Sequence, residues 1–260
     1  MKHKSRFYQL FGTDNIAYVC LLLCGILVVT FYSVKKDEPA PVAKPVASTP
    51  TTIGYVGDSI TYGTGGFRTA VDTEVGALGS HYKAINHGVG GTTSRDWQPG
   101  SRIYNTAIND FKERRVRVVS IMLGTNDARE DIATSSTAYK KNMTTLINSL
   151  LASGIQQVIV NYPPYAVPGS GGLWSDRSPG RLEAYMAQLD SLIDGKKVLK
   201  GDTQSYRYFQ NHQNELVDGI HPNGEGYNQL GKLWAKAYIT ATAKPSVGVA
   251  SLFTAARRSS

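Results

Sequence analysis

The chain has 260 residues, enough for one sizeable α/β domain with appendages. Its composition, 41% hydrophobic and 18% charged, is typical of a globular protein. Much of the formal net charge of +8 lies near the ends, because residues 1–46 carry six Lys or Arg against three Asp or Glu and the tail adds Arg257 and Arg258. The rest of the chain carries only +3 and contains no basic run interleaved with aromatics, which argues against nucleic-acid binding.

A short basic segment, residues 1–15, precedes an uncharged run at residues 16–34. The run is long enough to cross a bilayer as a helix, and Lys35 and Lys36 follow it in place of a signal-peptide cleavage site. We therefore predict an uncleaved transmembrane anchor with the N-terminus inside and the remaining chain outside the cytoplasm. Secretion after signal cleavage is the alternative.

Residues 35–50 contain four prolines and few residues that could pack in a core. This composition predicts an extended linker that reaches roughly 40 Å at about 3 Å per residue. At the other end of the chain, residues 245–260 are predicted to form a disordered tail.

Residues 51–244 alternate between apolar runs and amphipathic stretches, and we predict that they form one domain. Strands are expected at 52–57, 82–89, 116–123 and 156–163, and the last two are apolar enough to be buried on both faces. Helices are expected at 138–153, 181–194 and 224–241. Alternating strands and helices indicate βαβ units, a parallel sheet and hence a three-layer α/β/α sandwich.

Three glycine-bearing segments follow the first three predicted strands: GDS at 57–59, GVGGTTS at 88–94 and GTND at 124–127. The carboxyl ends of parallel strands lie at one edge of the sheet, where functional residues gather. The three segments are therefore expected to lie close together.

Ser59 is the candidate nucleophile in the first of these segments. No lysine stands near residues 57–66 and GxGxxG is missing after the first strand, so neither phosphate-binding motif fits. A nucleophilic serine needs a base, and the base needs an orienting carboxylate. Asp218 and His221, three residues apart before the last helix, provide such a pair.

The chain resembles the SGNH hydrolases, also called the GDSL esterase/lipase family, over roughly residues 52–240. Four blocks carry the resemblance in the family's order: GDSIT with Ser59, NHGVGGTTS with Gly91, GTND with Asn126, and DGIHP with Asp218 and His221. The resemblance implies a flavodoxin-like sandwich and ester hydrolysis without a metal or other cofactor.

The same chemistry predicts an oxyanion hole, since attack on an ester carbonyl places negative charge on its oxygen. The expected donors are the backbone N–H groups of Ser59 and Gly91 and the side-chain amide of Asn126. The second block departs mildly from the family's pattern, because Gly90 stands where a serine is frequent. Of the two adjacent glycines, Gly91 is the favoured donor.

The other polar residues receive structural predictions. Asp58 and Asp127 are expected to bond backbone groups at their turns. The histidines at 81, 87 and 212 lack ligand-like spacing, so no metal site is predicted.

Aromatic residues in the predicted loops are candidates for stacking on a sugar, with ordinary packing as the alternative. Trp234 lies in the last helix and is expected in the core. The three loop aromatics are Trp97, Tyr165 and Trp174.

The predicted activity is hydrolysis of small O-acyl esters, acetyl in particular, on a carbohydrate outside the membrane. The GDSIT block followed by GFR resembles the carbohydrate esterases of the family, and the segment 166–180 is polar and rich in glycine. The alternatives are a lysophospholipase or general esterase, an O-acyltransferase using the same acyl-enzyme, and a catalytically silent carbohydrate-binding module.

Overall fold

The computed structural model describes residues 50–169 and 176–243. The predicted anchor at 16–34, nearly all of the linker and the tail at 245–260 lie outside these ranges. Within them, no helix is both long enough and apolar enough to span a bilayer.

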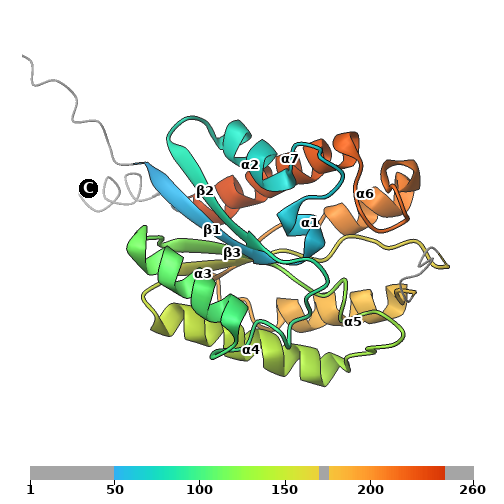
Figure 1. Ribbon diagram of the computed structural model, residues 1–260, viewed down its shortest axis with the longest axis horizontal. Coiled ribbons are helices and arrows are strands. Elements are labelled where there is room, and N and C mark those ends of the chain that lie inside the picture. The colour runs from blue at the N-terminus through green and yellow to red at the C-terminus, as the bar shows by residue number, and fades with distance from the viewer. Residues whose placement is uncertain (1–49, 170–175, 244–260) are drawn as a thin grey trace, which may run out of the picture. The chain divides into compact units, whose positions relative to one another are not determined.

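Five parallel strands form one sheet in the order β2-β1-β3-β4-β5, which is the flavodoxin-like order (Figure 1). The strands are β1 Thr51–Gly57, β2 Tyr82–Gly88, β3 Val118–Met122, β4 Gln157–Val160 and β5 Val198–Lys200. In register, Gly57 at the end of β1 is level with Gly88 of β2 and Met122 of β3. The predicted parallel α/β architecture is confirmed, and the three loops that follow these strands begin at one edge.

Burial explains the apolar character of the central strand. All five residues of β3 are buried, since β1 and β4 flank it and helices cover both of its faces. Its one polar residue, Ser120, accepts a hydrogen bond of 2.8 Å from the side-chain amide of Asn161. The fifth strand, β5, was not predicted, because only two apolar residues stand between the lysines of KKVLK.

Helices cover both faces of the sheet (Figure 1). On one face lie α2 Ala70–Leu78 and α7 Gly224–Thr242, and on the other lie α3 Arg102–Glu113, α4 Ser136–Ala152 and α5 Pro179–Asp190. The short elements α1 Ser59–Tyr62, α6 Ser205–Asn211 and the 3₁₀ turn Gln213–Glu215 complete the described elements. Trp234 of α7 is buried and stacks on Tyr55 of β1 at 6.3 Å between ring centroids, as expected for a core residue.

Side-chain caps fix where the long helices begin. Thr69 closes a capping box with Asp72 at the start of α2, and Asn223 accepts a hydrogen bond from the backbone of Gly226 at the start of α7. Serines at positions 101, 135 and 178 cap α3, α4 and α5 in the same way. The predicted helices at α4, α5 and α7 are confirmed within a few residues, whereas α2, α3 and α6 were not predicted.

Candidate active site

Ser59 lies at the junction of β1 and α1. Asp58 is buried and caps α1 by accepting a hydrogen bond of 3.0 Å from the backbone N–H of Ile60. A Cβ at Gly57 would lie 2.8 Å from the carbonyl oxygen of Met122 and would also clash with Thr61, so only glycine fits beside β3. The sequence Gly-Asp-Ser therefore turns the chain sharply and presents Ser59 at the carboxyl edge of the sheet.

His221 and Asp218 come from the loop that precedes α7. The carboxylate of Asp218 accepts hydrogen bonds from the backbone N–H groups of Ile220 and His221, at 3.0 and 2.8 Å. Val217 donates its backbone N–H to the carbonyl of His221 at 2.8 Å, which closes the loop. These bonds hold the two side chains together, as their spacing predicts.

A chain of two short contacts joins the predicted catalytic residues. Ser59 Oγ lies 2.8 Å from His221 Nε2, and His221 Nδ1 lies 2.7 Å from Asp218 Oδ2. An ionised carboxylate only accepts hydrogen bonds, so Nδ1 carries the proton and Nε2 is left to accept the hydroxyl proton of Ser59. This is the arrangement that a nucleophile, its general base and an orienting carboxylate require.

The electrostatics favour an ionised Asp218. Burial works to raise the pKa of its carboxyl, but hydrogen bonds from the backbone and side chain of His221 outweigh burial and lower the pKa below its usual value. In contrast, burial raises the pKa of Asp58 to about 6, against the opposing effects of the Ile60 N–H and of His221. The acid next to the nucleophile therefore titrates closer to neutral pH than the acid that orients the base.

The second and third loops meet at Asn126. This side chain is buried, and its Nδ2 donates to the carbonyl of Thr92 at 3.0 Å, which ties it to the loop that carries Gly91. Gly91 has φ +76°, in the left-handed region that favours glycine, and a Cβ there would meet nothing within 4 Å. A Cβ at Gly90 would lie 3.8 Å from that of Ser59, so this loop passes beside the nucleophile. The choice of Gly91 over Gly90 as donor stays a prediction.

Asp127 also links these two loops. Its buried carboxylate accepts hydrogen bonds from the backbone N–H and the hydroxyl of Ser94, at 2.8 and 2.6 Å. Burial raises the pKa of Asp127, while the bonds from Ser94 act to lower it. Both Asp58 and Asp127 therefore bond backbone groups, as predicted for structural residues.

Arg177 is a residue of the site that sequence reasoning missed. Its guanidinium is buried, and its Nη2 donates a hydrogen bond of 3.0 Å to Oδ1 of Asn126. Arg177 stands in the polar segment SDRSPG, which contains no motif. Only the fold brings it to Asn126, 51 positions earlier in the chain.

Two of the three loop aromatics are packed in the protein, which was the alternative to stacking on a sugar. Trp97 is only 1% exposed, and its indole N–H donates to Thr92 Oγ1 at 3.1 Å, so it supports the second loop and offers no free ring face. Tyr165 is 9% exposed and packs edge-on against Tyr206. Trp174 lies outside the described residues.

Three other histidines among the described residues make structural contacts. His87 bonds Asp110 at 2.9 Å, His212 stacks on Tyr208, and His81 packs edge-on against Tyr82. Across residues 50–169 and 176–243, no three His, Cys, Asp or Glu side chains lie close enough together to hold a metal ion.

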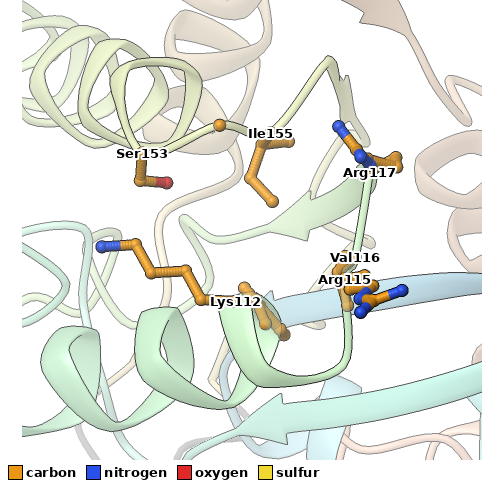
Figure 2. Close-up of a pocket in the computed structure, with 8 residues that line it drawn as sticks. Lys112, Arg115, Val116, Arg117, Ser153 and Ile155 are labelled. Atoms are coloured by element: carbon orange, nitrogen blue, oxygen red, sulfur yellow. The ribbon is translucent and has the colours of Figure 1, made fainter.

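Two cavities lie away from Ser59. One, of about 220 Å³, lies between the end of β5 and α7. The other, of about 210 Å³, lies where β3 and β4 begin, with Lys112 on one side and Arg115 and Arg117 on the other (Figure 2). Neither Ser59 nor His221 lines either cavity.

Solved structures of the same fold include several esterases. A lipase/acylhydrolase from Enterococcus faecalis is 24% identical with a TM-score of 0.59, and the match covers 76% of this chain and 100% of that one. An acetyl xylan esterase from Geobacillus stearothermophilus is 20% identical with a TM-score of 0.54 over 74% of this chain and 94% of that one. A carbohydrate acetylesterase from Sinorhizobium meliloti is 20% identical with a TM-score of 0.54 over 73% and 99%.

The family assignment comes from the sequence itself. None of the curated proteins compared with the chain matches it. Residues 55–229, which include Ser59, Asn126 and His221, match the profile of the GDSL-like lipase/acylhydrolase family. The chain therefore belongs to this family and is a carboxylic ester hydrolase.

Proposed function

We propose that the protein hydrolyses small O-acyl esters, acetyl in particular, on carbohydrate, through an acyl-enzyme formed on Ser59. The observation that carries the catalytic part is the contact chain from Ser59 Oγ to His221 Nε2, at 2.8 Å, and from His221 Nδ1 to Asp218, at 2.7 Å.

In the first half-reaction, His221 Nε2 takes the hydroxyl proton as Ser59 Oγ bonds to the ester carbonyl carbon. The carbonyl oxygen becomes an oxyanion, which the donors of Ser59, Gly91 and Asn126 stabilise. When the bond to the alcohol breaks, His221 returns the proton to the leaving oxygen, and the acyl group stays on Ser59. A water molecule then repeats these steps and releases the acid and the free serine.

Two observations support a small acyl group on a carbohydrate. Two of the solved structures with this fold are an acetyl xylan esterase and a carbohydrate acetylesterase. In addition, residues 166–180, which precede His221 in the sequence, are polar and rich in glycine and contain no long apolar run that could form a lid over an acyl chain.

One observation favours a second candidate, a lysophospholipase or general esterase. Three large apolar side chains near the predicted catalytic residues are exposed: Tyr62 of α1 at 63%, Phe67 at 41% and Val217 at 68%. Phe67 lies beside Gly224, at the start of the helix that follows His221. Such a rim could contact a longer acyl chain.

Chain-length profiling of the full chain separates the two candidates, with Ser59→Ala as the blank. For the proposed function, kcat/KM should fall at least about tenfold from p-nitrophenyl acetate to the octanoate, since a small pocket rejects added methylenes. A preference for octanoate would instead support the second candidate. Acetate release from O-acetylated xylooligosaccharides tests the carbohydrate, and mass spectrometry with an unacetylated sugar present distinguishes hydrolysis from acyl transfer.

We also propose that residues 16–34 anchor the domain outside the cytoplasm, because this run is uncharged and a proline-rich linker follows it. Protease added to intact cells should then release a fragment that begins within residues 37–50. A domain that stays fully protected would contradict this orientation, and a secreted domain without the anchor would indicate signal cleavage.

A further inference from the structure

The charged side chain of Arg177 is buried, which costs desolvation free energy. Its side chain is 5% exposed, and the desolvation of a buried ion costs several kcal/mol unless partners compensate it. Burial, together with the neighbouring Arg129, lowers its pKa, while Asp58 and Asp218 act in the opposite direction. A guanidinium still keeps its charge in proteins, so Arg177 is a fixed cation within the site.

The backbone holds Arg177 next to the loop that carries Asn126. Arg177 pairs with Arg129 in an isolated antiparallel bridge, and the N–H of Ser178 donates to the carbonyl of Ala128 at 3.1 Å. From this position the guanidinium reaches Oδ1 of Asn126 at 3.0 Å.

This contact decides which way the amide of Asn126 faces. A guanidinium only donates hydrogen bonds, so the atom it contacts must be the amide oxygen, and the NH2 group must lie on the opposite side. One N–H of that group is bonded to the carbonyl of Thr92. The second N–H is the one that can bond the oxyanion, and a charged donor on Oδ1 strengthens it by polarising the amide.

We propose that Arg177 is a positioning residue for ester hydrolysis, which holds and polarises the amide of Asn126 so that its second N–H bonds the oxyanion. The inference rests on the proposed function, because it assigns Arg177 a role only through the oxyanion hole. The charges of Asp58 and Asp218, which flank the nucleophile and the base, favour the charged form of the guanidinium.

A double-mutant cycle in the full chain tests whether Arg177 acts through Asn126. Kinetics with p-nitrophenyl acetate are measured for Asn126→Ala, Arg177→Met and the double variant, with thermal unfolding measured alongside. Asn126→Ala should lower kcat by about 10²–10³-fold, as is usual for one oxyanion donor. Arg177→Met should lower kcat by about 10–100-fold with KM within about twofold, because the donor acts on the transition state and not on substrate binding.

We expect the effect of Arg177→Met on kcat to depend strongly on whether Asn126 is present. In the Asn126→Ala background, Arg177→Met should change kcat by less than about threefold, because the amide through which it acts is gone. Full multiplication of the two effects, or an effect of Arg177→Met confined to KM or to unfolding, would overturn the inference. If Arg177→Met does not fold, Arg177→Lys replaces it in the same cycle, since lysine keeps the charge but lacks the planar fork.

Arg129→Met is the matched control. It removes the neighbouring guanidinium, which is ion-paired with Asp131. The contact of Arg129 with Asn126 is a backbone hydrogen bond that methionine keeps, so kcat should stay within about twofold of the wild type. Two arms of the experiment separate this inference from the proposed function. An active Ser59→Ala variant would overturn the proposed function, whereas a dead Ser59→Ala variant beside a fully active Arg177→Met variant would overturn only the role of Arg177.

Discussion

Charged side chains are hydrogen-bonded within the protein at the carboxyl edge of the sheet, whereas several at the amino edge are exposed to solvent. At the carboxyl edge, the side chain of Asp218 bonds His221 of the same loop. The side chains of Asp127 and Arg177 bond Ser94 and Asn126, respectively, which belong to other loops. At the amino edge, Lys112, Arg115 and Arg117 are exposed around the cavity shown in Figure 2. Within the described residues, none of these three cations belongs to an ion pair.

The difference follows from the topology. In a parallel sheet, every strand points its carboxyl end to the same edge, so loops that are distant in sequence meet there and can build one polar network. The strands' amino ends are preceded by turns that leave a helix and return to the sheet. These turns meet through backbone hydrogen bonds, such as that from the N–H of Gln156 to the carbonyl of Arg117, and their charged side chains at 112, 115 and 117 are exposed. Substitutions at the carboxyl edge should therefore impair chemistry, and substitutions at the amino edge should affect stability only slightly.

The largest effect is expected for Ser59→Ala, which removes the nucleophile. Turnover of p-nitrophenyl acetate should fall by about 10⁴-fold or more, because the acyl-enzyme can no longer form. Thermal unfolding should change little, since Ser59 is only partly buried and Asp58 still caps α1.

Ser80→Ala serves as the matched control, because Ser80 is an exposed serine in the turn before β2, at the amino edge. It should keep wild-type kcat/KM. Full activity in purified Ser59→Ala would show that the contact chain at the carboxyl edge is not the catalytic one.

A smaller loss is expected for Asp218→Asn. The pair of Ser59 and His221 remains, but the amide cannot stabilise the imidazolium as a carboxylate does, and it can hold the wrong tautomer. We expect kcat to fall on the order of 10³-fold, with KM nearly unchanged. Steady-state kinetics at neutral pH measure this, and a loss as large as that of Ser59→Ala would mean that Asp218 also holds the loop together.

The sequence predicted the carboxyl edge well for a physical reason. Ser59 and Asn126 stand within four residues of the ends of β1 and β3, and His221 stands three residues before α7. Such positions can be read from apolar periodicity and glycine. The parallel sheet followed from the same alternation. The order of the four blocks then predicted the catalytic roles of these residues.

What the sequence left out depends on contacts between distant segments. Arg177 carries no local signal, because its function depends on a hydrogen bond to a residue 51 positions away. The sequence left open whether Trp97 stacks on a sugar or packs in the core, because a loop position does not reveal that the buried indole bonds Thr92. The strand β5 was missed because three residues are too few for a periodicity, and α2 because its buried face includes the polar residues Thr73 and Glu74. The helix α3 was missed although its buried residues, at 104, 107, 108 and 111, have the spacing of an amphipathic helix.

Buried carboxyls allow a sharper comparison of the site with the core. Asp58, at the site, has the Ile60 N–H and nearby His221 to stabilise its charge, and its pKa is raised only to about 6. Glu74 of α2 is buried beside Tyr55 of β1, and burial raises its pKa to about 8, with Asp202 adding to the rise and Tyr55 opposing it. The core thus supports a carboxylate less well than the site does.

The sign of the resulting pH dependence is fixed. Because the folded-state pKa of Glu74 lies above its ordinary value of 4.5, the folded state binds a proton that the unfolded state has lost between the two values. The free energy of unfolding should therefore fall as pH rises from about 4.5 to about 8, by up to ~1.4 kcal/mol per pH unit. Glu74→Gln should remove this loss, so the variant should match the wild type at pH 5 and exceed it at pH 8. Urea unfolding at both pH values measures it, and parallel curves for the two proteins would contradict the assignment.

The smallest effect is expected at the amino edge, for Arg115→Gly. The end of α3 is closed by hydrogen bonds from the N–H of Val116 to the carbonyl of Phe111, at 2.9 Å, and from the N–H of Arg115 to the carbonyl of Lys112, at 3.1 Å. This pattern is a Schellman motif, and it places Arg115 at φ 54°, where glycine is the residue usually found. Glycine relieves the strain of the left-handed conformation but gains freedom in the unfolded chain, so we expect a net stabilisation of about 0.5–1 kcal/mol.

Urea unfolding measures the gain in the free energy of unfolding. Arg114→Gly is the control, which should be destabilised instead, because it loses the ion pair with Asp110 and places glycine where φ is −89°. Since the cation at 115 faces solvent and contacts no part of the site, kcat/KM should be unchanged in Arg115→Gly. A fall in kcat/KM without a fall in stability would show that the amino edge contributes to catalysis, and the contrast between the two edges would then not hold.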